Sequence, residues 1–83
     1  MRLKDIYKAI TDTWQFAKKY LTNIDKNESD EYWQKLMRDC DKIYEDANKQ
    51  DEDLKIFIQD ITKAVVQLLT RLADNKIHKL REE

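Results

Sequence analysis

The chain has 83 residues, of which 41% are hydrophobic and 40% charged, with a net charge of −1 and neither Gly nor Pro. This length allows one small domain, and the lack of Gly and Pro excludes the tight turns of most sheets and the glycine-built loops that hold phosphate. The nearly neutral charge gives no general attraction to nucleic acid or to an anionic membrane.

The first predicted helix covers about residues 2–24. Its apolar residues alternate steps of four and three, the spacing of a coiled-coil seam, as Leu3, Tyr7, Ile10, Trp14, Ala17, Leu21 and Ile24. We predict that this series is the buried face. A stripe of lysines follows the opposite flank, and we interpret it first as a solvated face and second as a partner-binding surface. The candidate partner-binding residues, with a Phe that falls outside both groups, are Lys4, Lys8, Phe16, Lys18 and Lys19.

The second predicted helix covers about residues 29–49. Ser29 is its expected N-cap, with Asp30 and Glu31 in the first turn, where negative charge meets the positive end of the helix dipole. The predicted core face consists of Trp33, Leu36, Cys40, Ile43 and Ala47. Because Cys40 stands in the middle of this face, we interpret it as a buried, inert thiol.

The third predicted helix covers about residues 53–80 and has the widest apolar surface. Its core line is Leu54, Ile58, Ile61, Val65, Leu68 and Leu72. A helix with such a wide apolar arc needs more than one neighbour to cover it. The sequence therefore predicts an all-α domain over residues 1–83, a three-helix up-down-up bundle with the third helix central.

A second apolar stripe runs along the C-terminal half of the third helix, rotated by roughly 100° from the core line. It consists of Val66, Ala73, Ile77 and Leu80. We predict self-association through this stripe, with a homodimer as the favoured assembly. The alternative is that the tail folds back over the open end of its own bundle.

No catalytic, cofactor or metal site is predicted. One His and one Cys cannot form a conventional zinc site, and the carboxylates lie on polar faces, where no apolar pocket shifts their pKa values. The start of the chain lacks the apolar run of a signal peptide or membrane span, so we expect a cytoplasmic protein. Nucleic-acid binding is disfavoured, because the lysine stripe has no Arg and no interleaved aromatic residues.

Three fragments carry a resemblance to known proteins: Asp30-Glu31-Tyr32-Trp33, Asp41-Lys42-Ile43-Tyr44 and Ala64-Val65-Val66-Gln67-Leu68-Leu69. They resemble small helical proteins encoded in prophages and mobile elements of low-GC Gram-positive bacteria. The resemblance covers roughly residues 30–72 and implies a genomic context, in which small proteins often bind and block a host protein, including components of antiviral defence. It implies no catalytic residues.

The function that we expect is therefore a non-enzymatic protein-binding module, with stoichiometric inhibition of a host defence protein as its most specific form. A structural, self-associating accessory protein without an external partner is the first alternative. A weak nucleic-acid or small-ligand binder is the second.

Overall fold

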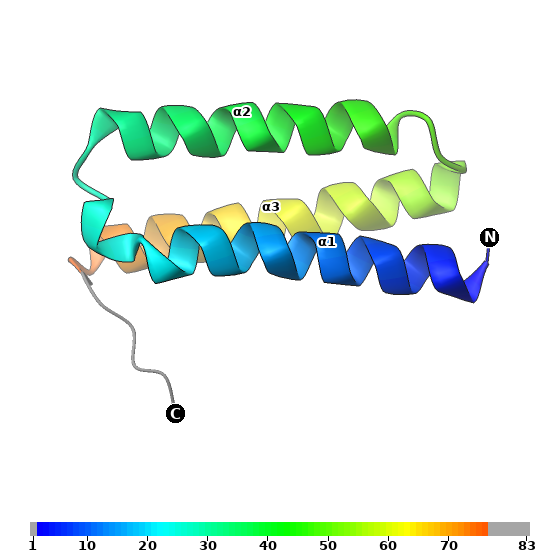
Figure 1. Cartoon of the computed structure of the whole chain (residues 1–83), viewed down its shortest axis with the longest axis horizontal. Helices are drawn as coiled ribbons and strands as arrows, with labels where there is room; N and C mark the ends of the chain where they lie inside the picture. The colour runs from blue at the N-terminus through cyan, green and yellow to red at the C-terminus, as the bar shows by residue number, and fades with distance from the viewer. Residues whose placement is uncertain (1, 77–83) are drawn as a thin grey trace.

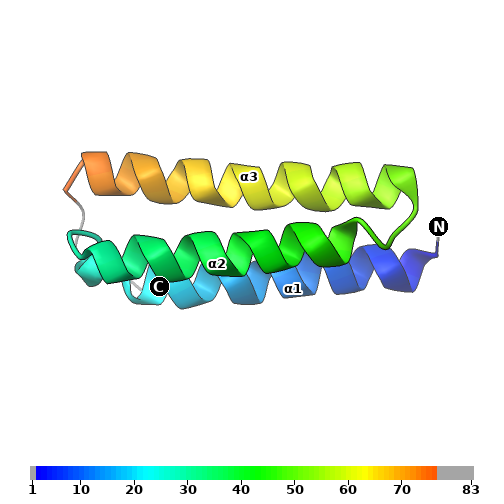
Figure 2. The ribbon, with the colours of Figure 1, turned by 90° about the horizontal axis from the view of Figure 1, so that it is seen from above.

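The computed structural model describes residues 2–76, and these residues form three α-helices and one short 3-10 helix. The elements are α1 (Leu3–Thr22), η1 (Ile24–Lys26), α2 (Asp30–Ala47) and α3 (Glu52–Asp74). The α-helices run up, down and up, and they lie side by side along their length (Figure 1; Figure 2). α3 packs on both α1 and α2, which confirms the predicted all-α bundle and the position of the third helix against both others.

The start of α2 follows the local prediction. Ser29 is the N-cap residue, with an extended backbone at φ −86° and ψ 132°, although its side chain makes no capping hydrogen bond. Asp30 and Glu31 stand in the first turn, where the positive end of the helix dipole favours negative charge. On the same helix, the expected pair between Lys35 and Glu31 forms at 3.3 Å.

The end of α3 differs from the prediction. We expected a helix to about Leu80, but α3 ends at Asp74. The chain turns there, since Lys76 has a left-handed backbone with φ 57° and its N–H donates to the carbonyl oxygen of Ala73. A left-handed residue just past the last turn is a common way to end a helix. The expected continuation from Ile77 to Leu80 lies outside the described residues.

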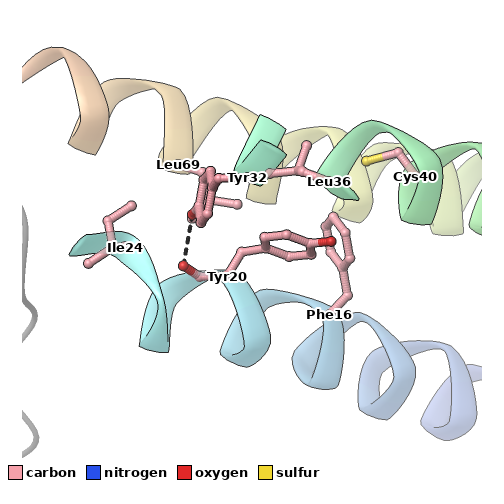
Figure 3. Close-up of a cluster of buried hydrophobic side chains, with 7 residues drawn as sticks. All are labelled: Phe16, Tyr20, Ile24, Tyr32, Leu36, Cys40 and Leu69. Atoms are coloured by element: carbon pink, nitrogen blue, oxygen red, sulfur yellow. Dashed lines mark hydrogen bonds between the residues drawn. The ribbon is translucent and has the colours of Figure 1, made fainter. Parts of the chain in front are cut away.

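One cluster of buried side chains, at the end of the bundle near η1, joins all three α-helices (Figure 3). Its members are Phe16, Tyr20, Ile24, Tyr32, Leu36, Cys40 and Leu69. Aromatic rings link α1 to α2, with the ring centroids of Tyr20 and Tyr32 5.4 Å apart in an edge-to-face arrangement. Phe16 extends the row, its ring centroid 5.3 Å from that of Tyr20. Pairs in such geometries contribute roughly 0.5–1.5 kcal/mol beyond the area that they bury.

The polar atoms of this cluster have partners. The Tyr32 hydroxyl donates to the carbonyl oxygen of Tyr20 at 2.8 Å, and the Tyr20 hydroxyl donates to the carboxylate of Asp39 at 2.5 Å. Burial raises the pKa of Tyr32 to about 12, which keeps this hydroxyl a neutral donor. Lys19 also donates to Asp39, at 3.0 Å. α1 and α2 are thus joined by a hydrogen-bonded group of four side chains and one backbone carbonyl.

The buried face of α1 differs from the prediction by one residue position. The buried residues are Ala9, Thr13, Phe16, Ala17 and Tyr20, while the N-terminal part of the predicted seam is exposed. The apolar arc of α1 is wider than one seam, so two adjacent faces compete for burial. The observed face keeps Ala17 and adds the rings of Phe16 and Tyr20, whose burial stabilises the bundle.

The core faces of the other two helices are closer to the prediction. In α2, Leu36, Cys40 and Ala47 are buried as predicted, and Tyr32 joins them. In α3 the fully buried face turns toward Thr62 and Leu69. As a result Leu68, which the predicted core line includes, is 39% exposed.

The first prediction concerns Thr62. Its hydroxyl is buried and has no hydrogen-bond partner among the described residues. Because a buried hydroxyl without a partner opposes folding, Thr62→Val should raise the free energy of unfolding by about 1 kcal/mol. Thr62→Ser is the matched control, since it keeps the hydroxyl, removes the methyl group and should lower stability. Urea unfolding of the three proteins tests this, and a Val variant no more stable than the wild type would contradict it.

The second prediction concerns Asp39 and pH. Burial alone raises the pKa of this carboxyl, but hydrogen bonds from Tyr20 and Lys19 outweigh it and leave the pKa below its usual value. A lowered folded-state pKa stabilises the fold above about pH 4, and this contribution is lost as the pH falls through the folded-state pKa.

Asp39→Asn should therefore be less stable than the wild type at pH 7, by no more than about 1 kcal/mol because the carboxylate is partly exposed. The difference should shrink when chemical unfolding is measured at decreasing pH below 4. Asp60→Asn, at an exposed position of α3, is the control and should show no comparable change with pH. A difference for Asp39→Asn that stays constant with pH would show that the charge is not what matters.

Candidate functional site

α1 exposes a row of four large apolar side chains. The exposed fractions are 86% for Leu3, 73% for Tyr7, 51% for Ile10 and 56% for Trp14. We call these four residues the α1 stripe. Single exposed apolar residues are ordinary, but a row of four, two of them aromatic, is typical of an interaction site.

The spacing of the α1 stripe is that of a coiled-coil seam. Its steps of four, three and four residues place all four side chains within roughly 60° of the helix surface. The centre of the row lies roughly 100° from the centre of the buried face of α1. One helix thus has two apolar faces side by side, one inside the bundle and one outside.

The α1 stripe borders α3 and faces away from α2. The opposite flank of α1 meets α2, since Lys19 pairs with Asp39 at 3.0 Å and Lys8 and Asp12 line a hollow shared with α2. Around α1, the buried face separates this flank from the stripe. Because α2 and α3 are the two α-helices beside α1 among the described residues, the edge with the stripe is the one next to α3.

The lysines predicted as a binding surface fall into two groups. Lys8 pairs with Asp12 at 3.0 Å, which raises the pKa of Lys8, and Lys19 pairs with Asp39 and stands 5.4 Å from the centroid of the Tyr20 ring.

Lys4 and Lys18 form the second group, are exposed and have no ion pair within residues 2–76. Lys4 directly follows Leu3 of the stripe, and Lys18 directly follows Ala17, which continues the same heptad series. Thr11 lies between the two lysines in the same row. The structure thus places two free ammonium groups along one edge of the α1 stripe.

The prediction for Phe16 is wrong. We expected it outside the core as a candidate partner-binding side chain, but it is only 7% exposed and belongs to the buried cluster. The cause is the same one-residue rotation of α1 that exposes the stripe. Phe16 therefore stabilises the fold and is not accessible to a partner.

Two of the four residues predicted for self-association, Val66 and Ala73, lie in the described part of the chain. Val66 is half-buried and packs against the core cluster. Ala73 is half-buried, and Ile77 and Leu80 lie outside the described residues. Self-association through this stripe stays a prediction.

The hollows and the reactive side chains are weaker candidates for a functional site than the α1 stripe. A mixed polar and apolar hollow of about 140 Å³ between the three helices is lined, among others, by Asp5, Thr13 and Asp46. Within the described part of the chain, no group of three or more His, Cys, Asp or Glu side chains could hold a metal ion. Burial raises the pKa of Cys40 to about 11, so this thiol stays protonated near neutral pH, in line with the inert role predicted.

Two further findings concern membrane spans and similarity to known proteins. None of the described helices combines the length and the apolar character needed to span a bilayer. Comparison of the chain with protein-family models, with curated proteins and with solved structures gives no significant match. Function is therefore argued from the α1 stripe itself.

Sequence reasoning assigned the residues of the α1 stripe to the core and so missed them as a site. Their regular spacing was correctly recognised, but spacing alone does not say whether a seam is closed inside the domain or by a partner. One signal was present: Phe16 does not fit the predicted seam, and a large aromatic residue outside the core line indicates a competing buried face.

The third prediction tests the exposure of the α1 stripe. Leu3→Gln and Tyr7→Gln should each change the free energy of unfolding by less than about 1 kcal/mol, because these side chains are the most exposed of the stripe and little buried area is lost. Phe16→Ala, on the buried face of the same helix, should cost about 3–5 kcal/mol and leave much of the protein unfolded. Thermal melts followed by circular dichroism measure all three. A large loss of stability in either Gln variant would show that the stripe is covered.

Proposed function

We propose that this chain is a protein-binding module whose interface is the α1 stripe. The observation that supports the proposal is the exposure of four large apolar side chains in heptad spacing on one edge of a folded bundle. Tyr and Trp are the residues most often found at the energetic centre of protein interfaces. The stripe supplies one of each, at Tyr7 and Trp14.

The energetics favour a partner over permanent exposure. Fully burying an exposed large apolar side chain gives about 1.5–3 kcal/mol, so burying the exposed parts of these four side chains offsets part of the cost of association, about 4–15 kcal/mol. α1 holds the side chains in a preformed helix, which limits the ordering cost that a flexible segment would add. Lys4 and Lys18 stand at the rim, where charge governs the choice of partner more than the affinity.

The partner class that we propose is a host protein, blocked by stoichiometric binding. This part of the proposal rests on the resemblance of residues 30–72 to proteins of prophages and mobile elements. Components of host defence are the first candidates within that class. Such a role needs only a stable interface, and it requires no catalytic group on the module.

The fourth prediction tests the interface. Wild-type protein, immobilised and exposed to a lysate of a low-GC Gram-positive bacterium, should retain a partner that the triple variant Tyr7→Gln, Ile10→Gln, Trp14→Gln fails to retain. The matched control is Met37→Gln with Ile56→Gln, which removes exposed apolar side chains outside the stripe and should keep the partner.

The retained protein, once purified, should bind the module in a one-to-one complex by titration calorimetry. Circular-dichroism melts of all the variants should agree with the wild type. A partner that binds the triple variant as tightly as it binds the wild type would contradict the assignment of the interface to the α1 stripe.

A further inference from the structure

We propose that the α1 stripe binds one amphipathic helix of the partner, packed as in a coiled coil, whose edge facing Lys4 and Lys18 carries carboxylates. This inference rests on the proposed function and specifies the chemistry of the partner. It follows from three features of α1: the spacing of the stripe, the two different edges of the stripe, and the charges along its open edge.

The spacing favours a helix as the occupant. Leu3 and Ile10 occupy one of the two seam positions of a heptad, and Tyr7 and Trp14 occupy the other. A straight row of this kind, about 60° wide, matches the seam between two helices. A helix lying in a bilayer interface presents a broader apolar face, and here the bundle and the lysines limit the stripe on both sides.

The two edges of the stripe are unequal. One edge consists of the residues directly before Tyr7, Trp14 and Leu21. These are Ile6, Thr13 and Tyr20, which are half-buried or buried in the bundle. The other edge consists of the residues directly after Leu3, Ile10 and Ala17, namely Lys4 and Lys18, which are exposed, and Thr11, which is partly exposed. A partner helix can therefore form ion pairs with α1 along one edge only, and that edge is basic.

The charges select against antiparallel pairing with a second copy of the chain at this site. In an antiparallel pair of α1 helices the open edges face each other, which brings Lys4 near Lys18 of the other copy, and like charges there oppose pairing. The acidic surplus of the chain lies in residues 27–53, which include α2 and carry ten acidic and four basic side chains. Since the stripe faces away from α2, this surplus does not offset the two free lysines. Carboxylates on the facing edge of a partner helix offset the charge of these two lysines.

The spacing of the two lysines sharpens the proposal. Lys4 and Lys18 are two heptads apart at equivalent positions, so one straight partner helix can meet both with acidic residues two heptads apart. Lys8 and Lys19 do not compete for these residues, because Asp12 and Asp39 already pair with them. The open edge thus has two fixed points that define where the carboxylates of the partner must lie.

The test uses two synthetic helical peptides with Leu at both seam positions of every heptad and no Trp. The acidic peptide has Glu at the flanking positions, and the basic peptide has Lys there. The acidic peptide should bind with one-to-one stoichiometry and shift the emission of Trp14 to the blue, and the shift should be absent in Trp14→Phe. The basic peptide should bind about tenfold more weakly, as expected when two exposed attractive charge pairs become repulsive.

Charge reversal gives the decisive comparison. Lys4→Glu with Lys18→Glu should reverse the preference between the peptides, while the control Lys42→Glu with Lys63→Glu, on α2 and α3, should leave it unchanged. Equal binding of the two peptides, or no reversal, would overturn the carboxylate assignment and leave the proposed function standing. Binding of neither peptide, with stripe-dependent capture of a partner intact, would overturn the helical partner alone.

Two other occupants give distinct results. A wild-type dimer in light scattering that the triple stripe variant abolishes would assign the stripe to a second copy and overturn the inference. A blue shift of Trp14 with vesicles of phosphatidylglycerol and phosphatidylcholine, without binding of the acidic peptide, would assign it to an anionic membrane. That result would also remove the support for the proposed function.

Discussion

The contact among Tyr20, Tyr32 and Asp39 determines how α1 is rotated in the bundle. The Tyr20 ring packs edge-to-face on Tyr32, its hydroxyl donates to Asp39, and the Tyr32 hydroxyl returns to the Tyr20 carbonyl oxygen. α3 packs on both other helices, but this group is what ties α1 to α2 through side chains. Because it holds one face of α1 inward, it leaves the adjacent apolar face outside. The exposure of the α1 stripe is thus a consequence of the aromatic core.

The apolar surface of α1 exceeds what three helices can enclose. Buried and exposed apolar residues together cover roughly half of its circumference, whereas contact with two neighbours buries a narrower arc. The division between the two faces is chemically reasonable. The face with Phe16 and Tyr20 supplies two large rings, and the Tyr20 hydroxyl has a partner in Asp39. The face with Ile10 and Trp14 keeps a straight row that a second helix can cover. Stability and recognition are therefore assigned to different sides of one helix.

The fold was predictable from the sequence because α2 and the chain connections carry unambiguous local signals. α2 has a single apolar face and a clear start at Ser29, so its bounds and most of its core follow directly. α1 has two overlapping apolar series, and the more regular one is the exposed one. The observed face places the hydroxyl of Tyr20 against an acceptor, Asp39, that belongs to another helix. No periodicity within α1 contains this information, so four residues predicted for the core of α1 are exposed, while Ala17 of the same series is buried as predicted.

The arrangement also separates affinity from selectivity. The α1 stripe is apolar and would form the dry centre of an interface, where burial supplies most of the free energy. Lys4 and Lys18 would stand at its rim, where water remains and isolated pairs contribute little to affinity but discriminate between partners of opposite charge. The lysines that pair with Asp12 and Asp39 are already committed to the bundle. Substitution in the stripe and substitution at the rim should therefore change different properties of one interface, because the structure places the two kinds of contact on separate residues.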